Sequence, residues 1–340
     1  MSIPSILIDH EEKVELRMRQ IFEKHDIPNL PLYRMMQYQL GWLGKDGIPE
    51  VGPTPSRLYG ALCMESANTF GGSVLSEHAG AAIEMLVNSI SVHEEMQTVG
   101  NPSHSRDAVW WVWGPAQAIN VGDSLHALSR LSIFGLQKLG LTAELTVQAV
   151  SHTDQCSLNY YEGQFLDLSF QERLDVSENQ YEQMVVAKNG SLLSSAIQLG
   201  AMMASASDSY QPVLREFAIK LALAIQIQTD LSDLWPTNPN SISFRVMNKS
   251  KLLPVINALE NATLAQKKSL GSIYFKRVMD PSDLPELRQI LENAGSKQYT
   301  EFKLKQAKEN LLQIVESLDL GFEAKNRWVE IVNAMTENEP

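Results

Sequence analysis

Residues 79–97 read A-G-A-A-I-E-M-L-V-N-S-I-S-V-H-E-E-M-Q, a long apolar run that ends in two adjacent glutamates. The length and composition of the run indicate a buried helix that begins near residue 75. Glutamates that only solvate a helix surface seldom follow such a run. The end of this helix is therefore the first candidate for a functional site.

Helical patterns of the same kind recur along nearly the whole chain. The segment nearest to strand alternation is T-A-E-L-T-V-Q-A-V, residues 142–150, and its flanks suit a helix as well. The other helices are expected over residues 12–24, 115–138, 178–206 and 211–234, with loops rich in Pro, Gly and Asn at 44–56, 98–107 and 235–244. None of these loops is long enough for an interdomain linker. We predict one all-α domain over residues 1–340, a single large helical bundle of about a dozen helices.

Composition excludes several classes of protein. The 340 residues carry a formal net charge of −12, which argues against nucleic acid or an anionic membrane as a general partner. Two cysteines form no disulfide framework, and the N-terminus is too short and too acidic for a signal peptide. The least polar run, residues 191–207, is shorter than the ~20 residues of a membrane span and is interrupted by serines. We expect a soluble cytoplasmic protein without a membrane span.

Acidic side chains stand at the ends of two predicted helices. Glu94, Glu95 and Thr98 follow one apolar run, and Asp230 and Asp233, three residues apart, follow another. All five offer hard oxygen ligands, and pairs at this spacing share a helix face. Two such helices would hold Mg²⁺ between them. The same spacing also suits two solvated helix ends, and spacing alone does not separate the two interpretations.

A wider pattern resembles the trans-polyprenyl diphosphate synthase family over residues 35–260. The segments that carry the resemblance occur in the family's order: G-A-L-C-M-E-S-A-N-T-F-G-G (60–72), W-V-W-G-P-A-Q-A-I-N-V-G-D-S-L (111–125), G-Q-F-L-D-L-S-F (163–170) and Y-E-Q-M-V-V-A-K-N-G-S-L-L (181–193). The resemblance implies the all-α prenyl synthase or class I terpene synthase bundle. It also implies that the two acidic helices face each other across a deep central cavity.

The acidic motifs depart from the family pattern. The first D-D-x-x-D reads Glu94-Glu95-x-x-Thr98, and the second reads Thr229-Asp230-x-x-Asp233. The resemblance implies that Glu94 and Asp230 are the catalytic metal ligands for Mg²⁺. It implies that Glu95, Thr98 and Asp233 assist them.

The basic motifs depart further. The G-K-R-x-R-P position reads P-S-R-L-Y-G and keeps only Arg57, and the R-R position falls on Ser103-His104. The K-T pair keeps its lysine as Lys188, and a later family lysine matches Lys251. In the family these groups hold two diphosphates, and each charge-assisted bond contributes roughly 1.5–3 kcal/mol. The second-substrate site, for isopentenyl diphosphate, is therefore expected to be dismantled. The residues implied to bind diphosphate are Lys188, Lys251, Arg57, Gln226 and Gln228.

Three functions are compatible with this pattern. Loss of the second-substrate site predicts a class I terpene synthase-like lyase, which ionises a prenyl diphosphate with Mg²⁺ and releases pyrophosphate. The alternatives are a catalytically impaired partner subunit of a prenyl diphosphate synthase and a chain-elongating prenyltransferase. Acids kept at both motifs argue against the subunit, and the missing basic residues argue against the elongating enzyme. A homodimer is expected, and a class II cyclase or a prenyl synthase is a further partner considered.

The expected substrate has twenty carbons, either linear or already cyclised. In the resembling family, the residue five before the first acid forms the floor of the chain pocket. Here that residue is Ser89, with Ile90 beside it and Met85 and Leu86 one turn deeper. A serine leaves the pocket open beyond the first floor, so a fifteen-carbon chain is not the expected limit.

Overall fold

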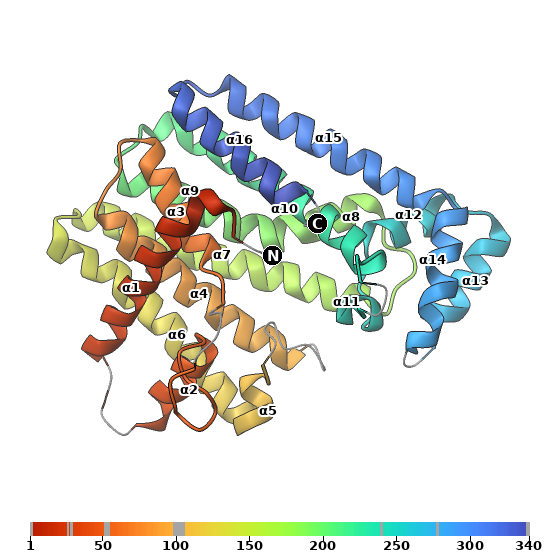
Figure 1. Ribbon diagram of the computed structural model, residues 1–340, viewed down its shortest axis with the longest axis horizontal. Helices are drawn as coiled ribbons and strands as arrows, with labels where there is room; N and C mark the ends of the chain where they lie inside the picture. Colours follow the sequence, from red (N-terminus) through yellow and green to blue (C-terminus); the bar gives the residue numbers. More distant parts are fainter. Residues whose placement is uncertain are drawn as a thin grey trace. The chain divides into compact units, whose positions relative to one another are not determined.

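The computed structural model describes residues 3–25, 27, 30–50, 55–97, 106–238, 241–276 and 279–337. These residues form sixteen α-helices and no strand, apart from an isolated bridge between Leu43 and Pro49, which confirms the all-α prediction. The helices (Figure 1) are α1 (Ile8–His25), α2 (Pro31–Gln39), α3 (Leu58–Thr69), α4 (Leu75–Gln97), α5 (Val109–Trp113), α6 (Pro115–Gly135), α7 (Ala143–Phe170), α8 (Glu178–Val185), α9 (Ser191–Met203), α10 (Gln211–Leu234), α11 (Phe244–Met247), α12 (Leu253–Asn261), α13 (Leu264–Tyr274), α14 (Leu284–Asn293), α15 (Ser296–Ser317) and α16 (Phe322–Thr336).

The long apolar runs form the helices expected of them. The runs at 75–97 and 211–234 match α4 and α10. The segment nearest to strand alternation belongs to α7, which begins at Ala143. The helices outnumber the expected dozen, partly because short helices such as α5 and α11 carry too few residues to show a period. The expected helix at 178–206 is divided into α8 and α9 by a π-helical segment, Val186–Gly190.

Close contacts divide the chain into two compact units. Unit 1 comprises Met1–Ser157 and Ser194–Arg215, and unit 2 comprises Leu158–Leu193 and Glu216–Pro340. The expectation of a single domain over residues 1–340 stays a prediction. No helix of the described residues is long and apolar enough to cross a membrane.

Helix α4 is the centre of unit 1 and packs against α1, α3 and α6 (Figure 1). Glycines let α3 and α4 approach each other closely. A Cβ on Gly60 would lie 2.8 Å from the carbonyl oxygen of Gly80, and a Cβ on Gly80 would lie 2.9 Å from that of Gly60. The carboxylate of Glu84 reaches the start of α3 through this crossing and accepts a hydrogen bond from the Gly60 N–H at 2.8 Å.

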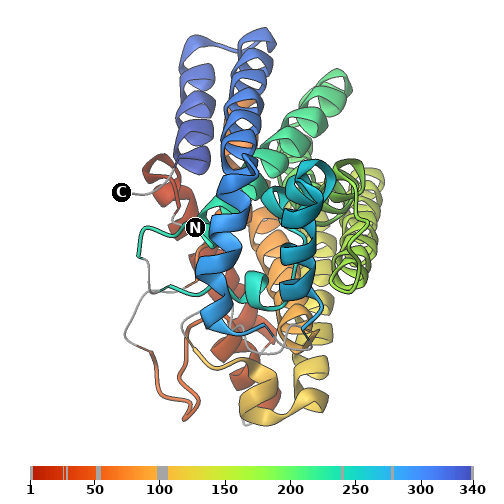
Figure 2. The same ribbon diagram turned by 90° about the vertical axis from the view of Figure 1, so that its right-hand side faces the viewer.

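Unit 2 contains two apolar clusters, one around α12 to α14 and one that includes Phe170, Tyr181 and Ile256. Helices α15 and α16 lie side by side as a pair (Figure 2). The ring of Trp328 on α16 meets Phe217 on α10 edge to face, with ring centroids 5.3 Å apart. The two apolar clusters include Ile227 and Leu234, which lie toward the end of α10, where the second acidic motif is found.

Candidate functional site

The first acidic motif lies in unit 1, in the last turn of α4. Glu95 is buried, with 4% of its surface exposed, and Glu94 is half-buried. The preceding His93 lies 3.6 Å from the carboxylate of Asp123 on α6. Thr98, the third predicted ligand, lies outside the described residues, as do Ser103 and His104 of the former R-R position. The roles predicted for Glu94, Glu95 and Thr98 stay predictions.

Arg57 is part of the interior of unit 1. It is only 1% exposed, and its guanidinium donates from Nε to Glu15 at 2.9 Å and from Nη2 to the Leu40 carbonyl at 2.6 Å. Its backbone N–H donates to Glu11 at 2.8 Å. The predicted contact of Arg57 with a diphosphate stays a prediction, and in the structure its guanidinium joins α1 to the chain before α3.

Burial also acts on Glu84, which is 1% exposed and feels the charge of Arg57. Desolvation raises the pKa of Glu84 to about 7, and the Arg57 charge and the Gly60 and Tyr59 N–H groups offset only part of the rise. The folded state therefore keeps the proton to a higher pH than the unfolded chain, whose ordinary pKa is 4.5.

We expect the free energy of unfolding to fall as pH rises from 4.5 to about 7, by on the order of 3 kcal/mol from this residue. The contribution is complete below pH 4.5 and is lost as pH rises through the folded pKa. Urea unfolding of the wild type and of Glu84→Gln across this range measures it. The glutamine keeps an acceptor for Gly60 but does not titrate, so the two profiles should diverge; parallel profiles would contradict the assignment.

The second acidic motif lies in unit 2 and is built around Asp230, which is completely buried. Its Oδ1 accepts hydrogen bonds from Gln226 Nε2 and Arg245 Nη2, both at 2.7 Å. Its Oδ2 accepts from the Tyr181 hydroxyl at 2.7 Å and from the Leu253 N–H at 2.9 Å. A carboxylate has about four lone-pair sites. All of those of Asp230 are therefore used by the protein.

The contact with Leu253 places the carboxylate at the first turn of α12. The first N–H groups of a helix have no partner within the helix, and their end of the helix favours a negative charge. Asp230 thus satisfies one such N–H and adds the favourable charge. The carboxylate also raises the pKa of Tyr181, after burial, which is the larger cause.

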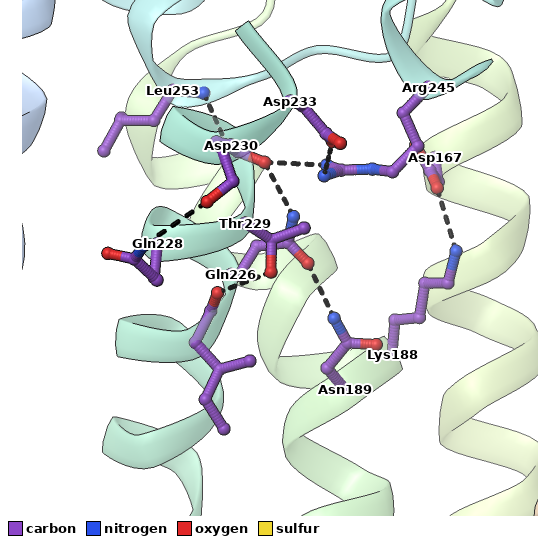
Figure 3. A network of polar contacts seen from close by, with 12 residues as sticks. Asp167, Lys188, Asn189, Gln226, Gln228, Thr229, Asp230, Asp233, Arg245 and Leu253 are labelled. Atoms are coloured by element: carbon purple, nitrogen blue, oxygen red, sulfur yellow. Dashed lines mark hydrogen bonds and ion pairs between the residues drawn. The ribbon is translucent and has the colours of Figure 1, made fainter. Parts of the chain in front are cut away.

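Arg245, on α11, lies between the two acids of the motif (Figure 3). Its guanidinium donates from Nη2 to Asp230 and from Nη1 to Asp233 Oδ2 at 2.6 Å. Burial acts to lower the pKa of Arg245, but the carboxylates of Asp230 and Asp233 raise it overall, so the side chain stays charged. Burial raises the pKa of Asp233, and the Arg245 charge opposes that rise.

The Mg²⁺ that the resemblance implies needs carboxylate oxygens with lone pairs that no hydrogen-bond donor occupies. Asp230 has no such lone pair, because four donors bind its two oxygens. Asp233 is bound by the same guanidinium, that of Arg245. Within the described ranges, no group of three or more His, Cys, Asp or Glu side chains is arranged to hold a metal ion. The pair as arranged here does not fit Mg²⁺. The ligand roles of Asp230 and Asp233 stay predictions that a binding experiment can decide.

Lys188 lies in the π-helical segment, and its ammonium pairs with Asp167 on α7 at 3.0 Å. Gly163 makes this approach possible, because a Cβ there would lie 2.5 Å from the Lys188 backbone nitrogen. Asp167 follows Gly163 by one helical turn and so lies on the same face of α7. Beside Lys188, Asn189 Nδ2 donates to the side-chain oxygen Oε1 of Gln226 at 2.7 Å (Figure 3), and Gln226 in turn donates to Asp230. Single-turn π segments are frequent at functional sites.

The two other residues predicted to bind diphosphate have partners within unit 2. Gln228 donates to the Ser232 hydroxyl at 3.3 Å. The ammonium of Lys251 is buried and donates to the carbonyls of Gln171 and Lys249 at 3.0 Å. Burial, with the nearby Lys249 charge, lowers the pKa of Lys251 to about 8. The diphosphate contacts of Lys188, Gln226, Gln228 and Lys251 stay predictions.

The predicted pocket residues all lie on α4 in unit 1, and each is at most 3% exposed. They are Met85, Leu86, Ser89 and Ile90. Ser89 is the smallest of them and is completely buried.

Sequence reasoning missed Arg245, Asp167 and Tyr181 as members of the site. Arg245 follows the loop expected at 235–244. In the sequence it is marked only as a positive charge that comes 12 residues after Asp233 and 15 residues after Asp230. Tyr181 precedes Asp230 by 49 residues, a separation that carries no periodic signal.

The Polyprenyl synthetase family profile matches residues 56–291, well over half of the chain. The chain belongs to the polyprenyl synthetase family. This confirms the resemblance and places the family's boundary further toward the C-terminus than the 260 expected.

Named relatives of this polyprenyl synthetase family member cover most of its length. A short chain isoprenyl diphosphate synthase from Methanothermobacter thermautotrophicus is 26% identical over 93% of this chain and 94% of its own. A geranylgeranyl diphosphate synthase from Mycobacterium tuberculosis is 28% identical over 78% of this chain and 76% of its own. A crystal structure of a polyprenyl synthetase from Streptomyces coelicolor covers 99% of this chain and 100% of its own, with a TM-score of 0.86 and 23% identity, and supports the fold.

Proposed function

We propose that this polyprenyl synthetase family member is an enzyme of prenyl transfer that acts on an allylic prenyl diphosphate. The observation that carries the proposal is the match to relatives named as isoprenyl and geranylgeranyl diphosphate synthases, one of them over 93% of this chain. These relatives favour transfer over the lyase reaction expected from the missing basic residues. The proposal includes a homodimer.

Transfer and lyase chemistry share their first step. The C–O bond of the allylic diphosphate breaks, the electron pair leaves with the diphosphate, and an allylic cation remains. In transfer, the double bond of isopentenyl diphosphate attacks the cation, a C–C bond forms and a proton is lost. In the lyase reaction, the cation is captured by its own double bonds, by water, or by loss of a proton. What captures the cation therefore decides the class of enzyme.

The lyase remains the second candidate because of one observation in unit 1. Arg57 is the one basic residue kept at the G-K-R-x-R-P position, and its guanidinium is buried against Glu15 and the Leu40 carbonyl. The residue is only 1% exposed, so its remaining N–H groups are enclosed by the protein and not open to a second diphosphate. Prenyl transfer by this chain would need other donors for isopentenyl diphosphate.

One assay separates the two reactions. Purified protein with Mg²⁺ is given geranyl, farnesyl or geranylgeranyl diphosphate, each with and without labelled isopentenyl diphosphate. We expect label in a lengthened diphosphate of up to twenty carbons and little pyrophosphate release without the acceptor. Chromatography of the products and a pyrophosphate assay provide the measurement. The twenty-carbon limit is proposed from the buried Ser89 and from relatives named for geranylgeranyl diphosphate.

Each other result points to a different function. Pyrophosphate release from the allylic substrate alone, with a hydrocarbon or alcohol product, would replace transfer by the lyase. Inertness toward all substrates, with activity gained on mixing with a prenyl synthase, would identify a partner subunit. Glu94→Gln should abolish turnover, whereas the exposed Glu144→Gln is a matched control that should keep it.

A further inference from the structure

Asp230 and Asp233 in unit 2 share one cation that the chain itself supplies. Asp230 and Asp233 carry two negative charges, and the Arg245 guanidinium between them carries one positive charge. Its two arms bind one carboxylate each, at 2.7 and 2.6 Å. A guanidinium is planar, always charged and bound through directed N–H groups. It thus places one positive charge at the position between the acids, where a shared divalent metal ion would place two.

Arg245 is held in this position. Its side chain is only 29% exposed, and Asp167 adds a further attractive charge from α7. Asp167 is itself paired with Lys188 (Figure 3), and its charge acts on Arg245 without a direct bond to it. If Arg245 moved away, Asp230 would still accept hydrogen bonds from Tyr181, Gln226 and Leu253.

We propose that Arg245 is the resident cation of the Asp230–Asp233 pair, that it replaces a divalent metal ion there, and that these two acids bind no Mg²⁺ in the wild-type protein. The retained aspartates then hold α11 against α10 through Arg245. The inference concerns the cation in unit 2 and holds whichever reaction the protein catalyses.

The test counts bound metal ions and needs no substrate. Mn²⁺ serves as the probe, and the loss of the electron paramagnetic resonance signal of free Mn²⁺ gives the number bound by the full chain. The variants are Asp233→Asn, Arg245→Met, and the double variant that carries both. Arg173→Met is the matched control, because Arg173 pairs with Asp175 through two N–H groups in the same unit but at its surface.

We expect Asp233→Asn to bind as many Mn²⁺ ions as the wild type, since Asp233 holds Arg245 and no metal. Arg245→Met should bind one more ion, because removal of the guanidinium exposes Asp233 and one site on Asp230. The double variant should lose that additional ion, and Arg173→Met should match the wild type.

Two results would overturn the proposal. If Asp233→Asn binds one ion fewer than the wild type, the pair holds a metal despite Arg245. If folded Arg245→Met gains no ion, the guanidinium does not occupy a potential metal position. Should circular dichroism show that Arg245→Met does not fold, the comparison of Asp233→Asn with the wild type decides alone, since that substitution keeps the size of a partly exposed side chain.

Discussion

Asp230→Asn is expected to lower the free energy of unfolding by about 3–5 kcal/mol, because it leaves the buried charge of Arg245 without one of its partners. The carboxylate accepts hydrogen bonds from four donors. The NH₂ group of an asparagine would face some of these donors and could not accept a hydrogen bond from them. Urea unfolding followed by circular dichroism measures the loss. The sequence alone predicts loss of turnover with an intact fold, and the complete burial of Asp230 changes that expectation.

Asp233→Asn provides the control for this experiment. Asp233 lies three residues away on the same helix, is partly exposed and shares Arg245 as a partner. Its replacement should cost about 1.5–3 kcal/mol, the range of one hydrogen bond to a charged group, and less than the replacement of Asp230. Equal losses of unfolding free energy in the two variants would mean that the four donors around Asp230 give it no larger role in stability than Asp233 has.

Gly163→Ala is expected to lower the free energy of unfolding by about 2–3 kcal/mol, the cost of overpacking a close contact. The added Cβ would lie 2.5 Å from the backbone nitrogen of Lys188 and 2.9 Å from the carbonyl carbon of Ala187. These are backbone atoms, so α7 and the π-helical segment would have to separate. The same unfolding assay measures the effect.

Gly135→Ala is the matched control for this substitution. Gly135 ends α6, and a Cβ there would meet no atom within 4 Å. Alanine at such a helical position should stabilise the protein by about 0.5–1 kcal/mol, through helix propensity and a less flexible unfolded chain. If both alanine variants shift stability in the same direction, the close approach at Gly163 is not the cause.

The fold was predictable because apolar periodicity is a local signal. The runs at 75–97 and 211–234 set α4 and α10 almost to the residue, since each helix buries the side chains that form its pattern. The π-helical segment was not predictable in this way. A π turn shifts the helical register by one residue, and this one lies where Gly163 packs closely against Lys188, although neither residue signals the other along the chain.

The chemistry of the site was predictable only in part. Glu94, Asp230 and Lys188 were predicted from their place in a family pattern, which identifies positions but not partners, and their roles stay predictions. The bonds of Arg57 to Glu15 and of Arg245 to Asp230 depend on contacts across 42 and 15 residues. Whether a charged side chain is open to a substrate or used by the fold is decided by those contacts.

The four donors around Asp230 give this residue a structural role that is independent of catalysis. They come from α8, α10, α11 and α12, so this carboxylate joins three helices to its own. Natural selection for folding alone would therefore keep the aspartate, even in a lineage that had abandoned catalysis. Arg245 stands differently, because one codon change at that position would remove the cation and leave both acids in place.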